Sequence, residues 1–233
     1  IEPAPAKHIK MEFIGVSITC GYGVDDPDKE HHFKTATEDV TKAYAYKTAL
    51  ALNADYSMVS VSGYGIISGF TNDGNKIPEQ TIPQYYDKLG FSYNKFADSI
   101  TVSETEWDFE RYKPDIIVIN LGTNDMNYAT TDERKAEFED GYLDFLKKVR
   151  SLNPDSYIFQ TYGVMGTSLE ENIENVRRKY MSETGDERIT FIPLTMQDED
   201  ADGIVADWHP SPRTHSLVSQ KVTAAIKKTL GYK

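Results

Sequence analysis

A serine follows the first hydrophobic segment of the chain, in the stretch FIGVSITCGYG from Phe13 to Gly23. Ser17 stands two residues after Gly15, among small and turn-forming residues. A serine that follows a strand commonly caps the next helix, but the same position can expose a nucleophile at the carboxyl edge of a sheet. Acyl transfer requires such a nucleophile, a base that takes its proton, and donors for the developing oxyanion.

Three further stretches carry groups that acyl transfer needs. SVSGYG contains Gly63, whose backbone N–H has no side chain to block a close approach. LGTND contains Asn124, whose amide can donate to the same oxyanion, and ADWHPS contains His209 just before the last predicted helix. We predict that Ser17 is the nucleophile and His209 the base. The N–H groups of Ser17 and Gly63, with the Asn124 amide, would form the oxyanion hole.

The remaining four histidines have weaker positions for catalysis. His8 precedes the first predicted strand, and His215 lies inside the last predicted helix. His31 and His32 adjoin in the loop DDPDKEHHF, which could suggest a metal. Adjacent ligands rarely converge on one ion, and no third ligand is suitably spaced, so a solvated loop is the better interpretation. We expect neither a metal nor an organic cofactor.

Short β-rich segments alternate with helical patterns along the chain, and they must position these groups. The predicted strands are Ile9–Ile14, Tyr56–Val61, Asp115–Leu121, Tyr157–Tyr162 and Arg188–Leu194. The predicted helices are residues 41–53, Thr131–Leu152, a segment after Ser168 whose SLEE resembles a capping box, and Thr214–Leu230. This alternation predicts an α/β fold, a doubly wound five-stranded parallel sheet flanked by helices and flavodoxin-like in type. Ligands bind such sheets at the carboxyl ends of the strands, where the candidate groups fall.

Residues 64–113 interrupt this alternation for about fifty residues. The segment is rich in Gly, Asn, Tyr and Phe, and TIPQYYDKLG is its best helical pattern. A connection of this length is unusual in a compact domain and indicates a functional excursion, although a surface insertion without a ligand is the alternative. Its aromatic residues could wall a cleft that binds sugar rings.

Composition limits the classes of function. The chain has 233 residues, a net charge of −12 and one cysteine, Cys20, so no internal disulfide forms. The acidity argues against nucleic acid as a partner, and no apolar run approaches the ~18 residues of a membrane span. We expect residues 1–8 to be a linker remnant from an upstream segment and residues 9–233 to form one catalytic domain.

The order Ser17, Gly63, Asn124, His209 resembles the SGNH (GDSL-like) hydrolases, whose four sequence blocks carry these residue types. The chain is still more similar to the acetyl-esterases of carbohydrate esterase family two. FIGVSITCGYG resembles that family's FIGDSITCGYG block, and ALNADYSMVSVSGYGI, INLGTND and DWHPS resemble its other blocks. The resemblance extends from Ile9 to the last helix. It also implies that an N-terminal jelly-roll domain typical of the family would end where this chain starts.

Two departures from the family pattern concern the catalytic groups. The aspartate of the usual GDS block is Val16 here, which removes a hydrogen-bonding group from the oxyanion loop and can lower activity. SGNH triads usually place an aspartate three residues before the histidine, but that residue is Ala206, and Asp207 is two before. Family-two enzymes often orient the histidine with a main-chain carbonyl. We therefore predict a Ser17–His209 dyad, with Asp207 a lesser candidate for orienting His209.

The resemblance implies a secreted or cell-surface serine esterase that removes O-acetyl groups from plant polysaccharides such as xylan or glucomannan. Its partner would be an acetylated polysaccharide or oligosaccharide. Trp208, Trp107 and Tyr64 are candidates for contacts with sugar, and a core position is the alternative for each tryptophan. Two other functions stay open. A lipase or thioesterase of the same fold would need an apolar acyl tunnel, and Val16 leaves room for a catalytically weak carbohydrate-binding relative.

Overall fold

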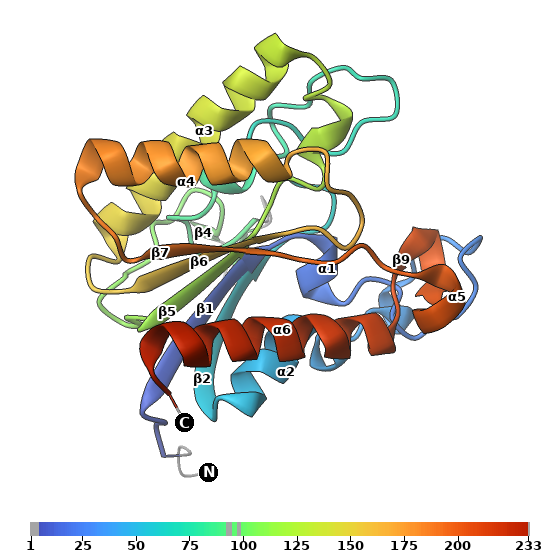
Figure 1. Ribbon diagram of the computed structural model, residues 1–233, viewed down its shortest axis with the longest axis horizontal. Helices are drawn as coiled ribbons and strands as arrows, with labels where there is room; N and C mark the ends of the chain where they lie inside the picture. The colour runs from blue at the N-terminus through green and yellow to red at the C-terminus, as the bar shows by residue number, and fades with distance from the viewer. Residues whose placement is uncertain (1–4, 92–94, 97–98, 233) are drawn as a thin grey trace.

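A five-stranded sheet lies at the centre of the structure, with the strand order β2-β1-β5-β6-β7 (Figure 1). Its strands are β1 (Ile9–Gly15), β2 (Ala54–Ser60), β5 (Ile116–Asn120), β6 (Tyr157–Tyr162) and β7 (Ile189–Pro193). Every neighbouring pair is parallel. This is the flavodoxin-like order of a doubly wound sheet. The predicted fold class is confirmed, and each predicted strand agrees with the observed one to within two residues at either end.

The computed structural model describes residues 5–91, 95–96 and 99–232. Residues 1–4 of the predicted linker segment lie outside the described residues. In the described part of the chain, no helix has the length and apolar character that crossing a membrane would require.

Two pairs of helices cover the two faces of the sheet. The long helices are α2 (Tyr44–Ala51), α3 (Asp132–Leu152), α4 (Glu170–Thr184) and α6 (Pro212–Leu230). Figure 1 shows α3 and α4 on one face and α2 and α6 on the other. The face under α3 and α4 also receives the 64–113 excursion, because Tyr64, Phe91 and Phe109 pack against its hydrophobic cluster.

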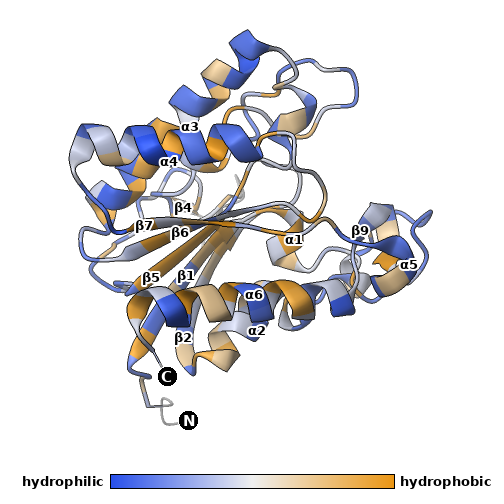
Figure 2. Ribbon diagram, viewed as in Figure 1, coloured by the Kyte–Doolittle hydropathy of each residue, from blue (hydrophilic) through white to orange (hydrophobic). Residues whose placement is uncertain are grey.

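Strand β5 shows why the sheet is buried on both faces. All five of its residues are buried. Side chains alternate along a strand, so Ile117 and Ile119 join the cluster under α3 and α4, whereas Ile116 and Val118 join the cluster under α2 and α6. Figure 2 accordingly shows the central strands largely in hydrophobic colours and the outer helix surfaces in hydrophilic ones.

The starts of α4 and α2 differ from the prediction, and α6 begins two residues earlier than predicted, at Pro212. Helix α4 begins at Glu170 after Leu169, and no side chain caps its first turn in the described part of the chain. The capping box predicted at Ser168 is therefore wrong, because the N-cap position falls on Leu169, one residue later, and a leucine side chain cannot accept a hydrogen bond. Helix α2 begins only at Tyr44, because Val40–Lys42 form a separate 3-10 turn. Asn53 ends this segment as predicted, with a left-handed φ of 49°.

Small elements complete the fold. The excursion contains the 3-10 turn Ile82–Gln84 and the two-residue strands β3 (Lys95–Phe96) and β4 (Ile100–Thr101). Helix α1 (Ser17–Cys20) follows β1 directly. Near the C-terminus, α5 (Glu199–Asp202) precedes a hairpin of β8 (Ile204–Val205) and β9 (His209–Pro210). This hairpin leads into α6 and carries His209.

Candidate active site

Ser17 is the first residue of α1, directly beyond the carboxyl end of β1. The turn is tight because a Cβ on Gly15 would lie 2.0 Å from the Thr19 hydroxyl, so a glycine is needed there. Ser17 is 5% exposed. Its N–H belongs to the first turn of α1, where backbone donors have no partner within the helix and remain available to an anion. Ser17 thus offers both a hydroxyl and a backbone N–H at one point.

The two other predicted oxyanion donors lie at the ends of neighbouring strands. Gly63 follows β2 and has a left-handed φ of 82°. No described atom would lie within 4 Å of a Cβ at this position, so its backbone is open to a ligand. Asn124 follows β5, and its amide nitrogen donates to the carbonyl of Tyr64 at 2.6 Å. That bond holds the amide with one N–H, while an amide has a second N–H to offer.

Ser17, Gly63, Asn124 and His209 line one cavity of ≈ 500 Å³. The cavity lies at the carboxyl ends of β1, β2 and β5. Chain order reverses between β1 and β5, and ligands of doubly wound sheets bind at this switch point. The structure therefore brings together all four groups that the sequence singled out for acyl transfer.

His209 is 9% exposed and two main-chain carbonyls face its ring. Its Nδ1 lies 2.9 Å from the carbonyl oxygen of Asp207 and 3.2 Å from that of Ala206. A carbonyl can only accept, so Nδ1 carries the proton and Nε2 is the free basic nitrogen. Burial lowers the pKa of His209, although these two carbonyls act in the opposite sense. The tautomer with the proton on Nδ1 is the one that a general base for a serine requires.

Backbone geometry aims these carbonyls at the ring. Asp207 and Trp208 both have left-handed φ values, 50° and 57°. Such values are uncommon for residues other than glycine and occur where surrounding contacts hold the strain. His209 itself is extended, with φ −80° and ψ 163°, as expected for a residue before Pro210.

The carboxylate of Asp207 does not face His209. It accepts hydrogen bonds from the Tyr22 hydroxyl at 2.6 Å, from the Phe33 N–H at 3.0 Å, and pairs with Nδ1 of His32 at 2.8 Å. Burial raises the pKa of Asp207, but these partners outweigh it and hold the pKa below its usual value. The Asp207 side chain therefore does not orient His209, because its carboxylate binds Tyr22, His32 and Phe33 instead.

Tyr22 is a site residue that sequence reasoning missed. Its ring stacks on His209 with centroids 4.0 Å apart and planes 22° from parallel. Its hydroxyl binds Asp207, so one side chain touches both the imidazole and the turn that directs the carbonyls. The signal was present in the CGYG run, five residues after Ser17.

The Asp125 carboxylate holds the loop just beyond Gly63. Val16 is 1% exposed and packs in the hydrophobic cluster between the sheet and helices α3 and α4. Its side chain has no group that can form a hydrogen bond. The carboxylate of Asp125 instead accepts from the backbone N–H groups of Ile66, Ile67 and Ser68, just beyond Gly63. Burial raises the pKa of Asp125 to about 6 despite these three donors. Sequence reasoning used its neighbour in LGTND and missed this residue.

The predicted sugar-contacting residues separate into two groups. Trp208 lines the catalytic cavity and is 47% exposed. Phe70, which sequence reasoning did not single out, lines it too. Trp107 instead lines a second cavity, and the Tyr64 ring packs against Tyr85 and Phe91. Of these three candidates for sugar contacts, the structure places Trp208 alone in the catalytic cavity.

The adjacent histidines His31 and His32 have separate partners. Nδ1 of His31 pairs with Asp26 at 2.9 Å, whereas Nδ1 of His32 pairs with Asp207. Within the described ranges, no group of three or more His, Cys, Asp or Glu side chains is arranged to hold a metal ion.

Comparisons with known proteins agree on the class of fold. The sequence model of the GDSL-like lipase/acylhydrolase family matches residues 13–217. The cellulase/esterase CelE of Acetivibrio thermocellus is 34% identical over 99% of this chain and 26% of its own length. An acetylxylan esterase/glucomannan deacetylase of Cellvibrio japonicus is 26% identical over 99% of this chain and 60% of its own.

A solved structure is also similar over the whole chain. It is a family two carbohydrate esterase from Clostridium thermocellum in complex with cellohexaose. It aligns with a TM-score of 0.84 and 32% identity, covering 100% of this chain and 68% of that one. The chain thus spans about a quarter to three fifths of the length of the two curated relatives.

Proposed function

The chain belongs to the GDSL-like lipase/acylhydrolase family, and we propose that it is a serine esterase that removes O-acetyl groups from plant polysaccharides such as xylan or glucomannan. The observation that carries this proposal is the convergence of Ser17, His209, Gly63 and Asn124 on one cavity. The names of the curated relatives support the substrate class. Because such polymers lie outside the cell, the proposed place of action is extracellular or at the cell surface.

Acylation begins at the Ser17 hydroxyl. Nε2 of His209 takes its proton while Oγ attacks the acetyl carbonyl carbon, and the carbonyl oxygen becomes an oxyanion. The N–H groups of Ser17 and Gly63 and the amide of Asn124 stabilise that charge. The imidazolium then gives its proton to the sugar oxygen as the C–O bond breaks, which releases the deacetylated sugar and leaves acetyl on Ser17.

Deacylation repeats these steps with water. His209 takes a proton from the water, whose oxygen attacks the acetyl carbon, and the same three donors hold the second oxyanion. The proton returns to Ser17 Oγ as acetate leaves. In both steps the positive charge on His209 is stabilised by the carbonyls of Ala206 and Asp207, which replace the carboxylate of a triad.

Release of acetate from acetylated xylan and acetylated glucomannan tests this proposal. The purified chain should release acetate from at least one polymer, and Ser17→Ala should not. A series of 4-nitrophenyl esters from acetate to decanoate separates the lipase alternative, since an acetyl-esterase should lose activity steeply as the acyl chain lengthens. Sugar binding without acetate release from any ester would instead favour a binding relative.

A further inference from the structure

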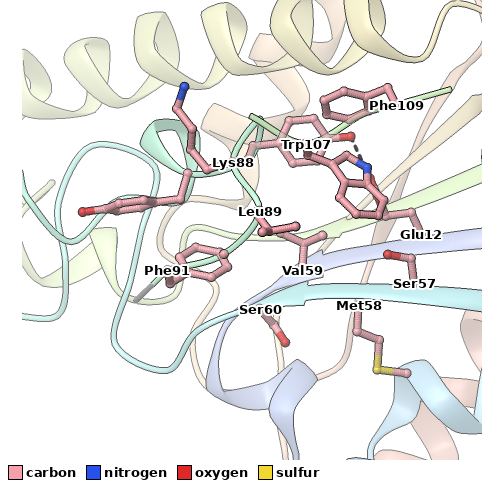
Figure 3. A pocket seen from close by; sticks show the side chains of 13 residues that line it. Glu12, Ser57, Met58, Val59, Ser60, Lys88, Leu89, Phe91, Trp107 and Phe109 are labelled. Atoms are coloured by element: carbon pink, nitrogen blue, oxygen red, sulfur yellow. Dashed lines mark hydrogen bonds between the residues drawn. The ribbon is translucent and has the colours of Figure 1, made fainter. Parts of the chain in front are cut away.

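A second cavity of ≈ 280 Å³ lies beside the edge strand β2, on the face of the sheet that α3 and α4 cover. One wall comes from the sheet and the other from residues 85–91 and 107–109 of the excursion (Figure 3). The aromatic rings on the excursion side are those of Tyr85, Tyr86, Phe91, Trp107 and Phe109. Glu12 and Ser57 are the polar side chains on the sheet side, whereas the Ser60 side chain points to the opposite face of β2, where its hydroxyl accepts from Cys20 (Figure 3). This combination has no part in the catalytic steps above.

The aromatic wall is held in place by its own backbone. The Trp107 N–H donates to the carbonyl of Asp87 at 2.9 Å, and the Leu89 N–H donates to that of Thr105 at 2.7 Å. The Asp87 carboxylate also pairs with Lys148 of α3 at 2.9 Å. A ligand would therefore meet a wall that is already ordered, which reduces the entropy lost on binding.

The polar side contains a buried carboxyl group. Glu12 is 5% exposed and faces Ser57 across the β1–β2 register. It accepts the Tyr86 hydroxyl at 2.7 Å, and Asn153 donates to that same hydroxyl at 2.8 Å. Burial raises the pKa of Glu12 to about 6, although Tyr86 and Ser57 lower it. A carboxylate has about four lone-pair sites, so these two partners leave it able to accept from a ligand.

The chemistry of the walls selects a neutral ligand with hydroxyl groups. Apolar ring faces bind the C–H faces of a sugar, while Glu12 and Ser57 can exchange hydrogen bonds with its hydroxyls. The carboxyl group of Glu12 and the net charge of −12 disfavour an anion. Lys88 also lines the cavity, but its ammonium lies 4.0 Å from Asp87 and points away from Glu12 and Trp107 (Figure 3). The volume is at the lower end of the roughly 300–1,000 Å³ of small-molecule sites, which fits one or two sugar rings.

We propose that this cavity is a second saccharide-binding site, which holds one or two rings of the polysaccharide at a distance from the acetyl group being removed. The inference rests on the proposed function for the identity of the polymer. Ser60 lines the second cavity and Ser62 lines the catalytic one, so the turn after β2 separates the two sites. A chain bound here would raise the effective concentration of its neighbouring sugars at Ser17.

The two tryptophans of the chain allow each cavity to be observed separately. Trp107 lines the second cavity and Trp208 the catalytic one. We would record the indole N–H resonances of the ¹⁵N-labelled wild-type protein while titrating unacetylated cello-, xylo- and manno-hexaose. The variants Trp107→Phe and Trp208→Phe assign the two signals. The Trp107 resonance should shift and saturate with at least one of the three sugars, and should still do so in Trp208→Ala.

The same titration has an outcome that would overturn the second site. A Trp107 resonance that stays in place to millimolar sugar overturns the proposal, whether or not Trp208 moves. Because the wild-type titration needs no variant of the second cavity, misfolding cannot produce a false negative. If Trp107 responds but no acetyl ester is hydrolysed, the second site stands and the proposed esterase fails, so the two failures are distinguishable.

Kinetics supply the functional readout. Trp107→Ala should raise KM for an acetylated oligosaccharide by about five- to tenfold, the scale expected when an aromatic contact is lost. Its kcat on 4-nitrophenyl acetate should stay within about twofold of wild type, because that substrate needs the catalytic cavity alone. Trp208→Ala is the matched control, an equal truncation in the other cavity. An unchanged KM in a folded Trp107→Ala protein would count against the second site.

Discussion

Replacing Asp207 by asparagine separates a dyad from a triad. In a triad the acid holds the histidine tautomer, and its amide variant loses about 10⁴ in kcat. In this structure the Asp207 carboxylate contacts Tyr22, His32 and Phe33, while Nδ1 of His209 faces main-chain carbonyls. The substitution leaves those carbonyls in place. We therefore expect a small effect on the rate.

The size of the effect follows from the hydrogen bonds that change. Asparagine keeps one acceptor oxygen and replaces the other with a donor, so Tyr22 or His32 loses its acceptor. A hydrogen bond to a charged group contributes about 1.5–3 kcal/mol to stability. The value of kcat falls only if the loss of this hydrogen bond displaces the turn at Asp207 and Trp208 or the Tyr22 ring. If about 1 kcal/mol of that loss reaches the transition state, kcat falls by about fivefold, and in any case by less than about tenfold.

Steady-state hydrolysis of 4-nitrophenyl acetate from pH 5 to pH 9 measures this prediction. Asp207→Asn should stay within about tenfold of wild type, while His209→Ala should lose thousands. Asp26→Asn is a matched control, because Asp26 also pairs with a histidine of the same loop, His31, and should leave kcat unchanged. A collapse of Asp207→Asn to the level of His209→Ala would refute the carbonyl-oriented dyad.

Three further predictions concern the same site. Ser17→Ala should lose about 10⁴ or more in kcat with an unchanged thermal unfolding curve, and a variant that keeps most of its turnover would exclude Ser17 as nucleophile. Asn124→Ala should lower kcat by about 10²–10³ with little change in KM, since the contact strengthens only in the transition state; a raised KM alone would contradict this. Burial lowers the pKa of His209, so the base stays neutral to lower pH, and the acid limb of kcat/KM should lie below the ordinary 6.5. A limb above pH 7 would contradict that effect of burial.

The types of the catalytic groups and the class of the fold could be predicted from sequence because both depend on local patterns. Strand β5 is a short apolar run, and α3 carries Phe138, Tyr142 and Val149 at helical spacing, so each element follows from periodicity. Parallel strands bring their carboxyl ends to one edge, which places Ser17 and Asn124 near each other without further information.

Sequence patterns did not decide the exact start of a helix or the neighbours of a side chain in a long loop. Ser168 had the pattern of a helix cap, but the N-cap position of α4 falls on Leu169. Trp107 and Tyr64 lie in a segment that was expected to wall a cleft for sugar rings. In the structure Tyr64 packs on Tyr85 and Phe91, and Trp107 lines the second cavity. Composition indicates that aromatic rings are available, whereas the path of a long loop decides which cavity they line.

The sequence by itself determined which groups could act as nucleophile, base and oxyanion donors, and it determined the sheet that carries them. Only the tertiary structure decided how His209 is oriented. That depends on left-handed backbone at Asp207 and Trp208, and on Tyr22, which hydrogen-bonds a residue 185 positions away and stacks on the imidazole. No local pattern encodes such a contact, because its free energy comes from segments that meet only when the chain has folded.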